Sequence, residues 1–183
     1  AWNSMAFLPD LLSSLEKQTF PNFRVLVIDN GSTDGACEYL REKFPGVSLL
    51  RNVKNLGFAA AHNQGFRYAL ERWGGQMLED KFVLVTNPDI ILEPECVEHL
   101  MRETQLHPQS ASFGPKLLKA RVQDPHDEVM REVIKSNVID STGLMARKSR
   151  AFADRGAGED DQGQYDGAKD IFGVSGALAL YRG

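Results

Sequence analysis

The sequence is poor in cysteine and lacks long apolar runs. Its two cysteines, Cys37 and Cys96, are too few for a disulfide framework. Cys96 and His99 share a ligand-like spacing, but no second pair accompanies them to complete a zinc site. The longest apolar stretches, such as residues 82–85 and 174–181, fall far short of the roughly 20 residues that span a bilayer. We therefore expect reduced thiols, a cytoplasmic location and no transmembrane segment.

An excess of positive charge is also lacking, since the formal net charge at pH 7 is -4. The cationic residues are spread along the chain apart from one local cluster, which consists of Arg147, Lys148, Arg150 and Arg155. Without a basic footprint, nucleic acid is not an expected partner. The chain also lacks the Gly-x-Gly-x-x-Gly turn that lets a backbone approach a pyrophosphate, which argues against a dinucleotide-dependent enzyme.

Helical spacing and short strand-like runs alternate along the chain. This pattern predicts an α/β fold with a mainly parallel sheet covered by helices on both faces. With 183 residues, of which 42% are hydrophobic, we expect a single domain, 1–183. Regular patterning weakens over residues 119–167, which we interpret as loops packed on the sheet, and apolar order returns over residues 171–181. The predicted helices cover residues 7–18, 35–44, 58–73 and 94–107, and the predicted strands cover residues 23–28, 47–50, 82–86 and 111–118.

Two carboxylates follow predicted strands, where ligands bind in open α/β sheets. Asp29 could accept hydrogen bonds from a base N–H or a ribose hydroxyl pair, or it could cap a turn with Asn30 and Ser32. Asp89 ends an Asn-Pro-Asp turn. If the ligand is a nucleoside diphosphate, Asp89 would need Mg²⁺ or Mn²⁺ between itself and the phosphates; otherwise the turn is an ordinary one.

Three segments carry a more specific signal in combination. They are Val27-Ile-Asp-Asn-Gly-Ser-Thr-Asp-Gly35, Asn55-Leu-Gly-Phe-Ala-Ala-Ala-His-Asn63 and Leu84-Val-Thr-Asn-Pro-Asp89. In order and spacing they resemble the family 2 glycosyltransferases of the GT-A fold, and most closely the rhamnosyltransferase-like members that build bacterial polysaccharides and cell wall. The resemblance runs from Trp2 to Tyr181.

The resemblance implies roles for individual residues. Asp29 would read the nucleotide base, with Asn30 beside it, and Asp89 would be the metal-binding end of an Asp-x-Asp-type motif whose first position here is Asn87. Trp2 matches an aromatic position that packs on the base, although it could equally be an ordinary core or surface aromatic. The segment that contains Asn55, Gly57 and Asn63 would pass beneath the donor, although either Asn could instead cap a helix.

The family pattern also implies that this chain is truncated at both ends. The family begins with a strand before the position of Trp2, and residues 1–4 hold neither an initiator Met nor a signal peptide. The family's general base is expected beyond Gly183, so no catalytic residue is assigned here. Glu159, Asp160 and Asp161 are alternatives for that base, or simply an acidic loop in water.

The function that the resemblance implies is metal-dependent transfer of a sugar, such as rhamnose, from a nucleoside-diphosphate donor with inversion. The acceptor would be a polysaccharide or glycolipid, and peripheral association with the inner face of the cell membrane is left open. The alternative is a nucleotide- or carbohydrate-binding domain without catalytic activity. This truncated chain is expected to be inactive without the region that supplies the base.

Overall fold

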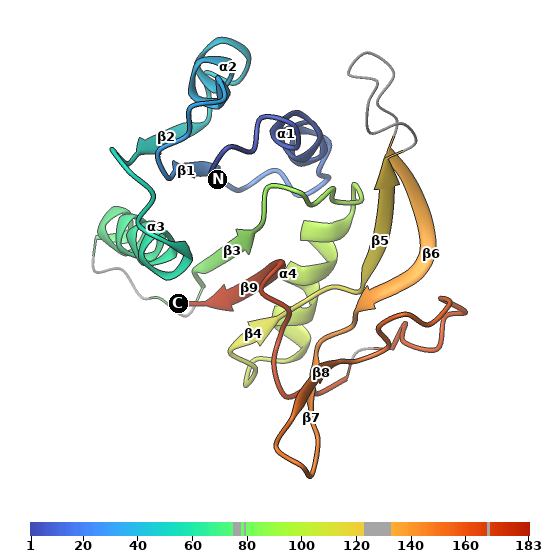
Figure 1. Cartoon of the computed structure of the whole chain (residues 1–183). Coiled ribbons are helices and arrows are strands. Elements are labelled where there is room, and N and C mark those ends of the chain that lie inside the picture. The colour runs from blue at the N-terminus through green and yellow to red at the C-terminus, as the bar shows by residue number, and fades with distance from the viewer. Residues whose placement is uncertain (75–77, 79, 123–132, 168) are drawn as a thin grey trace. The chain divides into compact units, whose positions relative to one another are not determined.

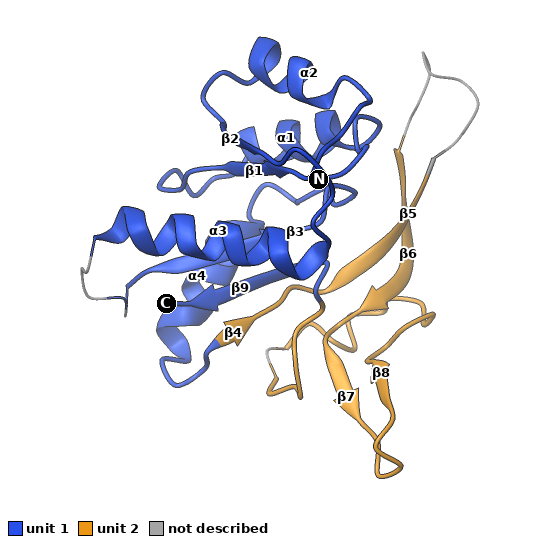
Figure 2. Ribbon diagram, turned by 60° about the vertical axis from the view of Figure 1, so that its left-hand side comes forward, with its two compact units in different colours: residues 1–111, 176–183 blue, residues 112–175 orange. Residues whose placement is uncertain are grey.

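The computed structural model describes residues 1–74, 78, 80–122, 133–167 and 169–183. The chain divides into two compact units, one of residues 1–111 with 176–183 and one of residues 112–175 (Figure 2). No helix among these described residues is long and apolar enough to cross a membrane.

Unit 1 contains four helices and four strands of the described chain (Figure 1). The predicted helices and strands up to residue 107 are confirmed, and the predicted bounds of α3 and β3 agree with those observed. The elements of unit 1 are α1 (Leu8–Glu16), β1 (Leu26–Asp29), α2 (Ala36–Lys43), β2 (Ser48–Arg51), α3 (Phe58–Trp73), β3 (Phe82–Thr86), α4 (Cys96–Leu106) and β9 (Leu178–Arg182).

The expectation of a mostly parallel sheet is wrong for the strand pairs of the described chain. β1 and β2 pair in parallel, with Leu26 opposite Ser48 and Asp29 opposite Arg51. β3 pairs antiparallel with β9. The first residue is hydrogen-bonded to the end of β1. The Ala1 amino group donates to the Ile28 carbonyl at 2.7 Å, and the Asn30 N–H donates to the Ala1 carbonyl at 2.8 Å. The N-terminus thus lies beside β1, and both ribbon views show it between β1 and β3 (Figures 1 and 2).

Apolar spacing explains the core of unit 1. Four leucines at three-to-four spacing place one face of α1 in the interior, and Pro9 is tolerated because it lies in the first turn. β9 contributes a continuous buried run, as expected for a strand with covered faces. α3 packs against β1 and β3, the strands that precede the predicted site residues Asp29–Asn30 and Asp89. The buried side chains here include Leu8, Leu11, Leu12, Leu15, Leu178, Ala179 and Leu180.

Unit 2 consists of short strands, so the interpretation of residues 119–167 as loops is wrong where these strands lie. β5 pairs antiparallel with β6 through an irregular register, and β7 pairs antiparallel with β8. Those register shifts break the two-residue alternation on which strand prediction depends, which explains the error. Residues 123–132 lie outside the described part. The strands are β4 (Ser112–Phe113), β5 (Leu117–Val122), β6 (Val133–Ser141), β7 (Leu144–Ala146) and β8 (Phe152–Asp154).

Candidate functional site

Asp29 ends β1 and is the most buried charged group of unit 1 among the described residues, with 1% of its surface exposed. The Ser32 N–H donates to both carboxylate oxygens, at 3.2 and 3.3 Å. The Arg51 guanidinium, opposite Asp29 in the parallel register, lies 3.5 Å from Oδ2. Asp29 therefore closes the turn that follows β1 and also forms an ion pair with Arg51 at the end of β2.

The surroundings of Asp29 keep its carboxylate ionised. Burial, the largest single influence, would raise its pKa, and hydrogen bonds from the Ser32 hydroxyl and the Cys37 thiol act in the opposite direction. The Ser32 N–H and the charge of Arg51 add to them, so the pKa of Asp29 lies below its usual value. Burial, followed by the nearby Asp29, raises the pKa of the Cys37 thiol to about 11, so this free cysteine stays protonated at neutral pH.

Asn30 is buried and links the loop after β1 to the loop after β2. Its Oδ1 accepts hydrogen bonds from Asn52 Nδ2 at 3.1 Å and from the Leu56 N–H at 3.0 Å. Its Nδ2 donates to Asn55 Oδ1 at 2.8 Å. Both ends of the amide are thus engaged inside the protein, and Asn30 fixes the position of residues 52–57.

The segment before α3 is shaped by Asn55 and Gly57. Asn55 Oδ1 accepts a hydrogen bond from the Gly57 N–H at 2.8 Å, two positions ahead. Gly57 precedes α3 with a φ of 84°, a conformation that a residue with a side chain rarely adopts. Asn55 therefore closes a turn just before α3; the N-cap residue of this helix is Gly57, and no side chain caps it, so the capping role left open by the sequence is not observed for Asn55.

The N-terminal segment lies against the loop that follows β1. The Asn3 N–H donates to Ser32 Oγ at 2.9 Å, and the Thr33 N–H donates to Asn3 Oδ1 at 2.9 Å. Within this segment Trp2 is 56% exposed, so it is a surface aromatic rather than a core one. An exposed indole beside these loops remains available for stacking on a planar ligand.

A cavity of about 360 Å³ opens where the loops after β1 and β2 meet. Its volume falls in the range of small-molecule sites. Its lining residues include two hydroxyl side chains, one amide and one guanidinium, which can form hydrogen bonds with a polar, partly anionic ligand. The lining residues are Gly31, Ser32, Thr33, Arg51, Asn52 and Val53.

The sequence did not single out Arg51 or Asn52, although both are central here. Asn52 is buried, and its amide exchanges two hydrogen bonds with that of Gln64 on α3, at 2.8 and 2.9 Å. The available signal was the parallel alignment of two strands that both end in a charged residue. It would have placed Arg51 beside Asp29.

No hydrogen bond or ion pair within the described chain joins Asp89 or Asn63 to the loops after β1 and β2. Asp89 is exposed in the turn after β3, and Asn63 is exposed on α3. The described residues contain no group of three His, Cys, Asp or Glu side chains that could hold a metal ion. A cation at Asp89 would therefore need oxygen ligands from phosphate and water, as Mg²⁺ commonly has.

The acidic loop of unit 2 has structural roles. Lys116 Nζ lies 2.6 Å from Asp161 Oδ2, and its hydrogen bond holds the pKa of Asp161 below its usual value. Glu159 accepts a hydrogen bond from the Tyr165 hydroxyl at 3.1 Å. A lowered pKa is the opposite of what a general base at neutral pH needs, which argues against Asp161 in that role.

Comparison with known proteins decides the family. The model of the family described as Glycosyl transferase family 2 matches residues 1–148. The chain belongs to this family. Family 2 members transfer a sugar from a nucleotide-sugar donor to an acceptor, so residues 1–148 belong to a glycosyltransferase domain.

Relatives agree with this assignment. The N-acetylglucosaminyl-diphospho-decaprenol L-rhamnosyltransferase of Mycobacterium tuberculosis is 32% identical over 124 residues, which cover 67% of this chain and 39% of that protein. S. aureus TarS 1-349 in complex with UDP is 26% identical with a TM-score of 0.50, covering 71% of this chain and 37% of that one. The same protein with UDP-GlcNAc gives a TM-score of 0.54 at 24% identity, covering 71% and 36%.

These likenesses support an α/β fold of the GT-A type. The chain spans about two fifths of the length of the curated rhamnosyltransferase that it matches.

Proposed function

We propose that this chain binds the donor of a bacterial glycosyltransferase that moves a sugar, such as rhamnose, from a nucleoside diphosphate to a polysaccharide or glycolipid acceptor. The observation that carries the proposal is the cavity of about 360 Å³ between the loops after β1 and β2, which is lined by Arg51, the ion-pair partner of Asp29. A family 2 domain needs a nucleotide site, and this cavity has the size and polarity for a nucleoside.

Asp29 and Arg51 would contact the nucleotide in different ways, Asp29 as a hydrogen-bond acceptor and Arg51 as a donor. A carboxylate held ionised by its surroundings accepts hydrogen bonds from a base N–H or a ribose hydroxyl pair without first losing a proton. Arg51 is about half exposed, so its guanidinium can turn some of its five donors toward the ligand while still contacting Asp29. Trp2, 56% exposed, would cover the base by stacking.

The residues beneath the donor would act mainly through the backbone. Gly57, with no side chain and a φ of 84°, allows a ligand to approach the start of α3 closely. Asn30 and Asn55 hold this segment in place, and Asn63, exposed on α3, is the side chain that we propose contacts the donor directly.

We assign Asp89 as the protein ligand of Mg²⁺ or Mn²⁺ during donor binding. One exposed carboxylate with a neighbouring Asn suits a hard cation that takes its remaining ligands from phosphate and water. When bound, the cation would offset the negative charge of the diphosphate as it leaves the sugar.

The remaining parts of the reaction are proposed on the family alone. Transfer with inversion requires a general base that deprotonates the acceptor hydroxyl, and we place this base outside residues 1–183, in the longer enzyme of which this chain would be the donor-binding part. The mycobacterial relative, of which the match covers 39%, leaves room for such a region. Because the proposed acceptor is a polysaccharide or glycolipid, we also propose work at the inner face of the membrane as a peripheral protein.

Calorimetric titration of the chain with UDP, dTDP and GDP, with and without Mn²⁺, tests the donor site. One nucleotide should bind in preference to the others, and Mn²⁺ should tighten that binding. Arg51→Ala should weaken it by roughly tenfold or more, since a hydrogen bond to a charged group typically contributes about 1.5–3 kcal/mol. Arg102→Ala, which removes the same charge from α4, is the matched control and should leave the affinity unchanged.

The metal assignment has its own control. Asp89→Ala should remove the Mn²⁺ dependence while weak metal-free binding persists, whereas Asp29→Ala should weaken binding with and without metal. A Mn²⁺ effect that survives Asp89→Ala would contradict the metal assignment. Failure of all three nucleotides to bind would leave the non-catalytic carbohydrate-binding alternative.

A further inference from the structure

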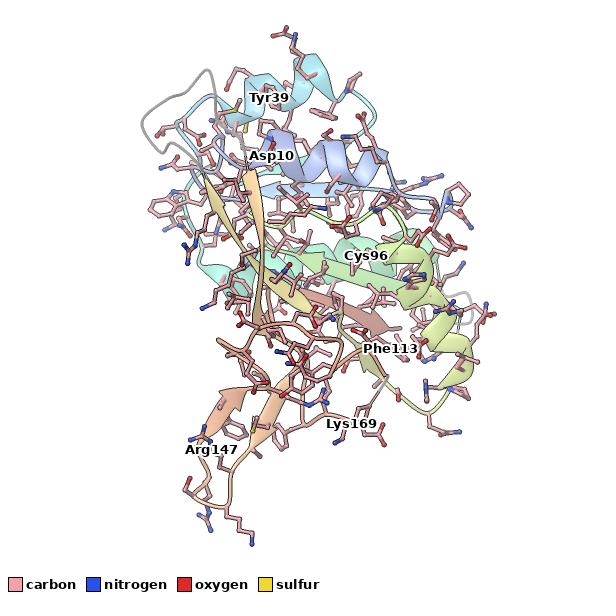
Figure 3. The ribbon with its side chains drawn as sticks, turned by 90° about the vertical axis from the view of Figure 1, so that its right-hand side faces the viewer. Asp10, Tyr39, Cys96, Phe113, Arg147 and Lys169 are labelled. Carbon is pink, nitrogen blue, oxygen red and sulfur yellow. The ribbon has the colours of Figure 1, made fainter. Side chains whose placement is uncertain are left out.

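The β7–β8 hairpin of unit 2 combines three cations with exposed aromatic side chains. Residues 145–152, at and around its turn, are all exposed. This stretch contains Arg147, Lys148 and Arg150 and no acidic residue, in a chain whose formal net charge is -4. Figure 3 shows Arg147 on this hairpin. The cluster is therefore a local reversal of the charge of the whole chain.

The aromatic part of this surface comes from two segments. Phe152 starts β8, and Phe172 lies beside β7, where its N–H donates to the Leu144 carbonyl at 3.1 Å. Their ring centroids are 5.0 Å apart. Even so, 59% of Phe152 and 66% of Phe172 remain exposed. Two paired rings that are mostly in contact with water are an unusual arrangement unless they meet another apolar phase.

The backbone of the turn adds an independent observation. The Arg150 N–H donates to the Arg147 carbonyl, and Arg150 has a φ of 63°. Three-residue hairpin loops normally place glycine at this left-handed position. Arginine is less stable than glycine in this left-handed conformation, but it adds a third positive charge at the turn.

We infer that the β7–β8 hairpin is a membrane-contact element that docks the protein on an anionic lipid surface. The three cations would face the lipid phosphates, and Phe152 and Phe172 would enter the interfacial layer, where aromatic rings are favoured. The overall negative charge does not prevent this, because charges more than about 10 Å away are largely screened at physiological salt. The inference deepens the peripheral membrane association proposed above and rests on it.

Sedimentation of the 183-residue chain with lipid vesicles tests this directly. It should bind vesicles of equal parts phosphatidylcholine and phosphatidylglycerol, bind pure phosphatidylcholine weakly, and be released by high salt. The triple variant Arg147→Ala/Lys148→Ala/Arg150→Ala should bind the anionic vesicles on the order of 100-fold more weakly, since each cation near such a surface contributes about fivefold. Lys17→Ala/Arg24→Ala/Lys43→Ala removes the same charge from exposed sites in unit 1 and should bind like the wild type.

A second pair of variants separates docking from folding. Arg150→Gly places the favoured residue at the left-handed position, so it should keep or stabilise the hairpin while weakening vesicle binding by about fivefold. Phe152→Trp should give fluorescence that shifts to the blue and is quenched by brominated lipid on anionic vesicles. Phe152→Ala/Phe172→Ala should weaken binding by roughly tenfold.

The outcomes distinguish this inference from the proposed function. If the chain binds nucleotide but not anionic vesicles, or if both triple variants bind vesicles equally well, the hairpin is not the docking element and the donor site stands. If Phe152→Trp binds vesicles while its new fluorescence stays unquenched, the hairpin faces water and the inference is overturned. If vesicles bind through the hairpin but no nucleotide binds, the proposed donor site fails alone.

Discussion

Asp29 has a buried carboxylate that must remain charged, and that requirement links the stability of unit 1 to pH. Its pKa lies below the ordinary value because its hydrogen bonds and the Arg51 charge together outweigh burial. A depressed folded-state pKa stabilises the fold at every pH above the unfolded-state value, which is near 3.8. This contribution disappears as the pH falls through the folded-state pKa.

The first prediction follows from this linkage. Asp29→Asn keeps the shape of the side chain but removes the charge that Ser32 and Arg51 contact, so it should lower the free energy of unfolding at pH 7 by about 1.5–3 kcal/mol. Urea denaturation at pH 7 and at pH values below 4 measures this. The difference between Asp29→Asn and the wild type should shrink as the pH falls. A difference that is constant over this range would mean that Asp29 contributes no charge-dependent stability.

A second prediction at the residue scale separates scaffold from ligand contact. Asn30 is buried with both ends of its amide engaged, whereas Asn63 is exposed on α3. Asn30→Ala should therefore lower the free energy of unfolding by about 1–3 kcal/mol. Asn63→Ala should change it by less than about 0.5 kcal/mol yet weaken nucleotide binding. If Asn63→Ala binds nucleotide as tightly as the wild type, Asn63 does not contact the donor.

At the scale of elements, the loop after β1 is held close to the loop after β2. Gly31 has a φ of +84°, and a Cβ atom there would lie 2.9 Å from Lys54 Cα. Gly35 has nearly the same φ, +86°, but nothing lies within 4 Å of its Cβ position. The two glycines thus share one backbone requirement, and only Gly31 adds a steric one.

This pair makes the third prediction. Gly35→Ala should cost only the left-handed conformation, about 1–2 kcal/mol. Gly31→Ala should cost more, because backbone must move, and it should also change the cavity that Gly31 lines. Thermal unfolding and nucleotide titration of the two variants provide the comparison. Equal losses of stability would show that the two loops can separate freely.

Unit 2 offers a comparable contrast within one ion cluster. Lys116 contacts both Asp161 and Asp166, whose side chains are 16% and 67% exposed. Hydrogen bonds to both carboxylates raise the pKa of Lys116, and that of Asp161 is lowered. The cluster should thus be intact from above the acid range to beyond pH 10, since Lys116 loses its charge only above its ordinary value of 10.5.

The fourth prediction is that Asp161→Asn destabilises the protein more than Asp166→Asn, because the exposed pair is better screened by water. Asp161 also accepts the Gly163 N–H at 3.1 Å, which Asp166 does not match. Denaturation of both variants at neutral pH compares them. Should Asp166→Asn prove the more damaging, exposure would be a poor guide to this cluster.

At the scale of the whole molecule, the sequence predicted elements better than their partners. The spacing of leucines and the Gly-Ser-Thr turn identified the helices and strands of unit 1 because period and turn chemistry are local. Local pattern does not say which strand lies beside β3, and its observed neighbour, β9, comes from the end of the chain. β5 and β6 were missed for a different reason, because their irregular register breaks the two-residue alternation that identifies a strand.

The candidate site divides in a similar way. Asp29 was visible as a carboxylate after an apolar run, and the roles that we propose for Trp2, Asp89 and the segment around Gly57 come from the family resemblance. The amide network of Asn30 and Asn52 was not visible, because it joins residues from separate loops. The ion pair with Arg51 depends on register, which sequence period alone does not provide.

The fifth prediction uses the two units together. Nucleotide with Mn²⁺ should slow amide hydrogen exchange around residues 29–34 and 51–58 of unit 1, because binding stabilises the state that it occupies, by about 2.7 kcal/mol at a hundredfold excess over Kd. Residues 144–154 should be unaffected by it. Anionic vesicles should do the reverse, protecting the hairpin and leaving the loops after β1 and β2 unchanged. If nucleotide alone protects the hairpin from exchange, unit 2 responds to the donor. The assignment of nucleotide binding to unit 1 and of lipid binding to the hairpin would then be wrong.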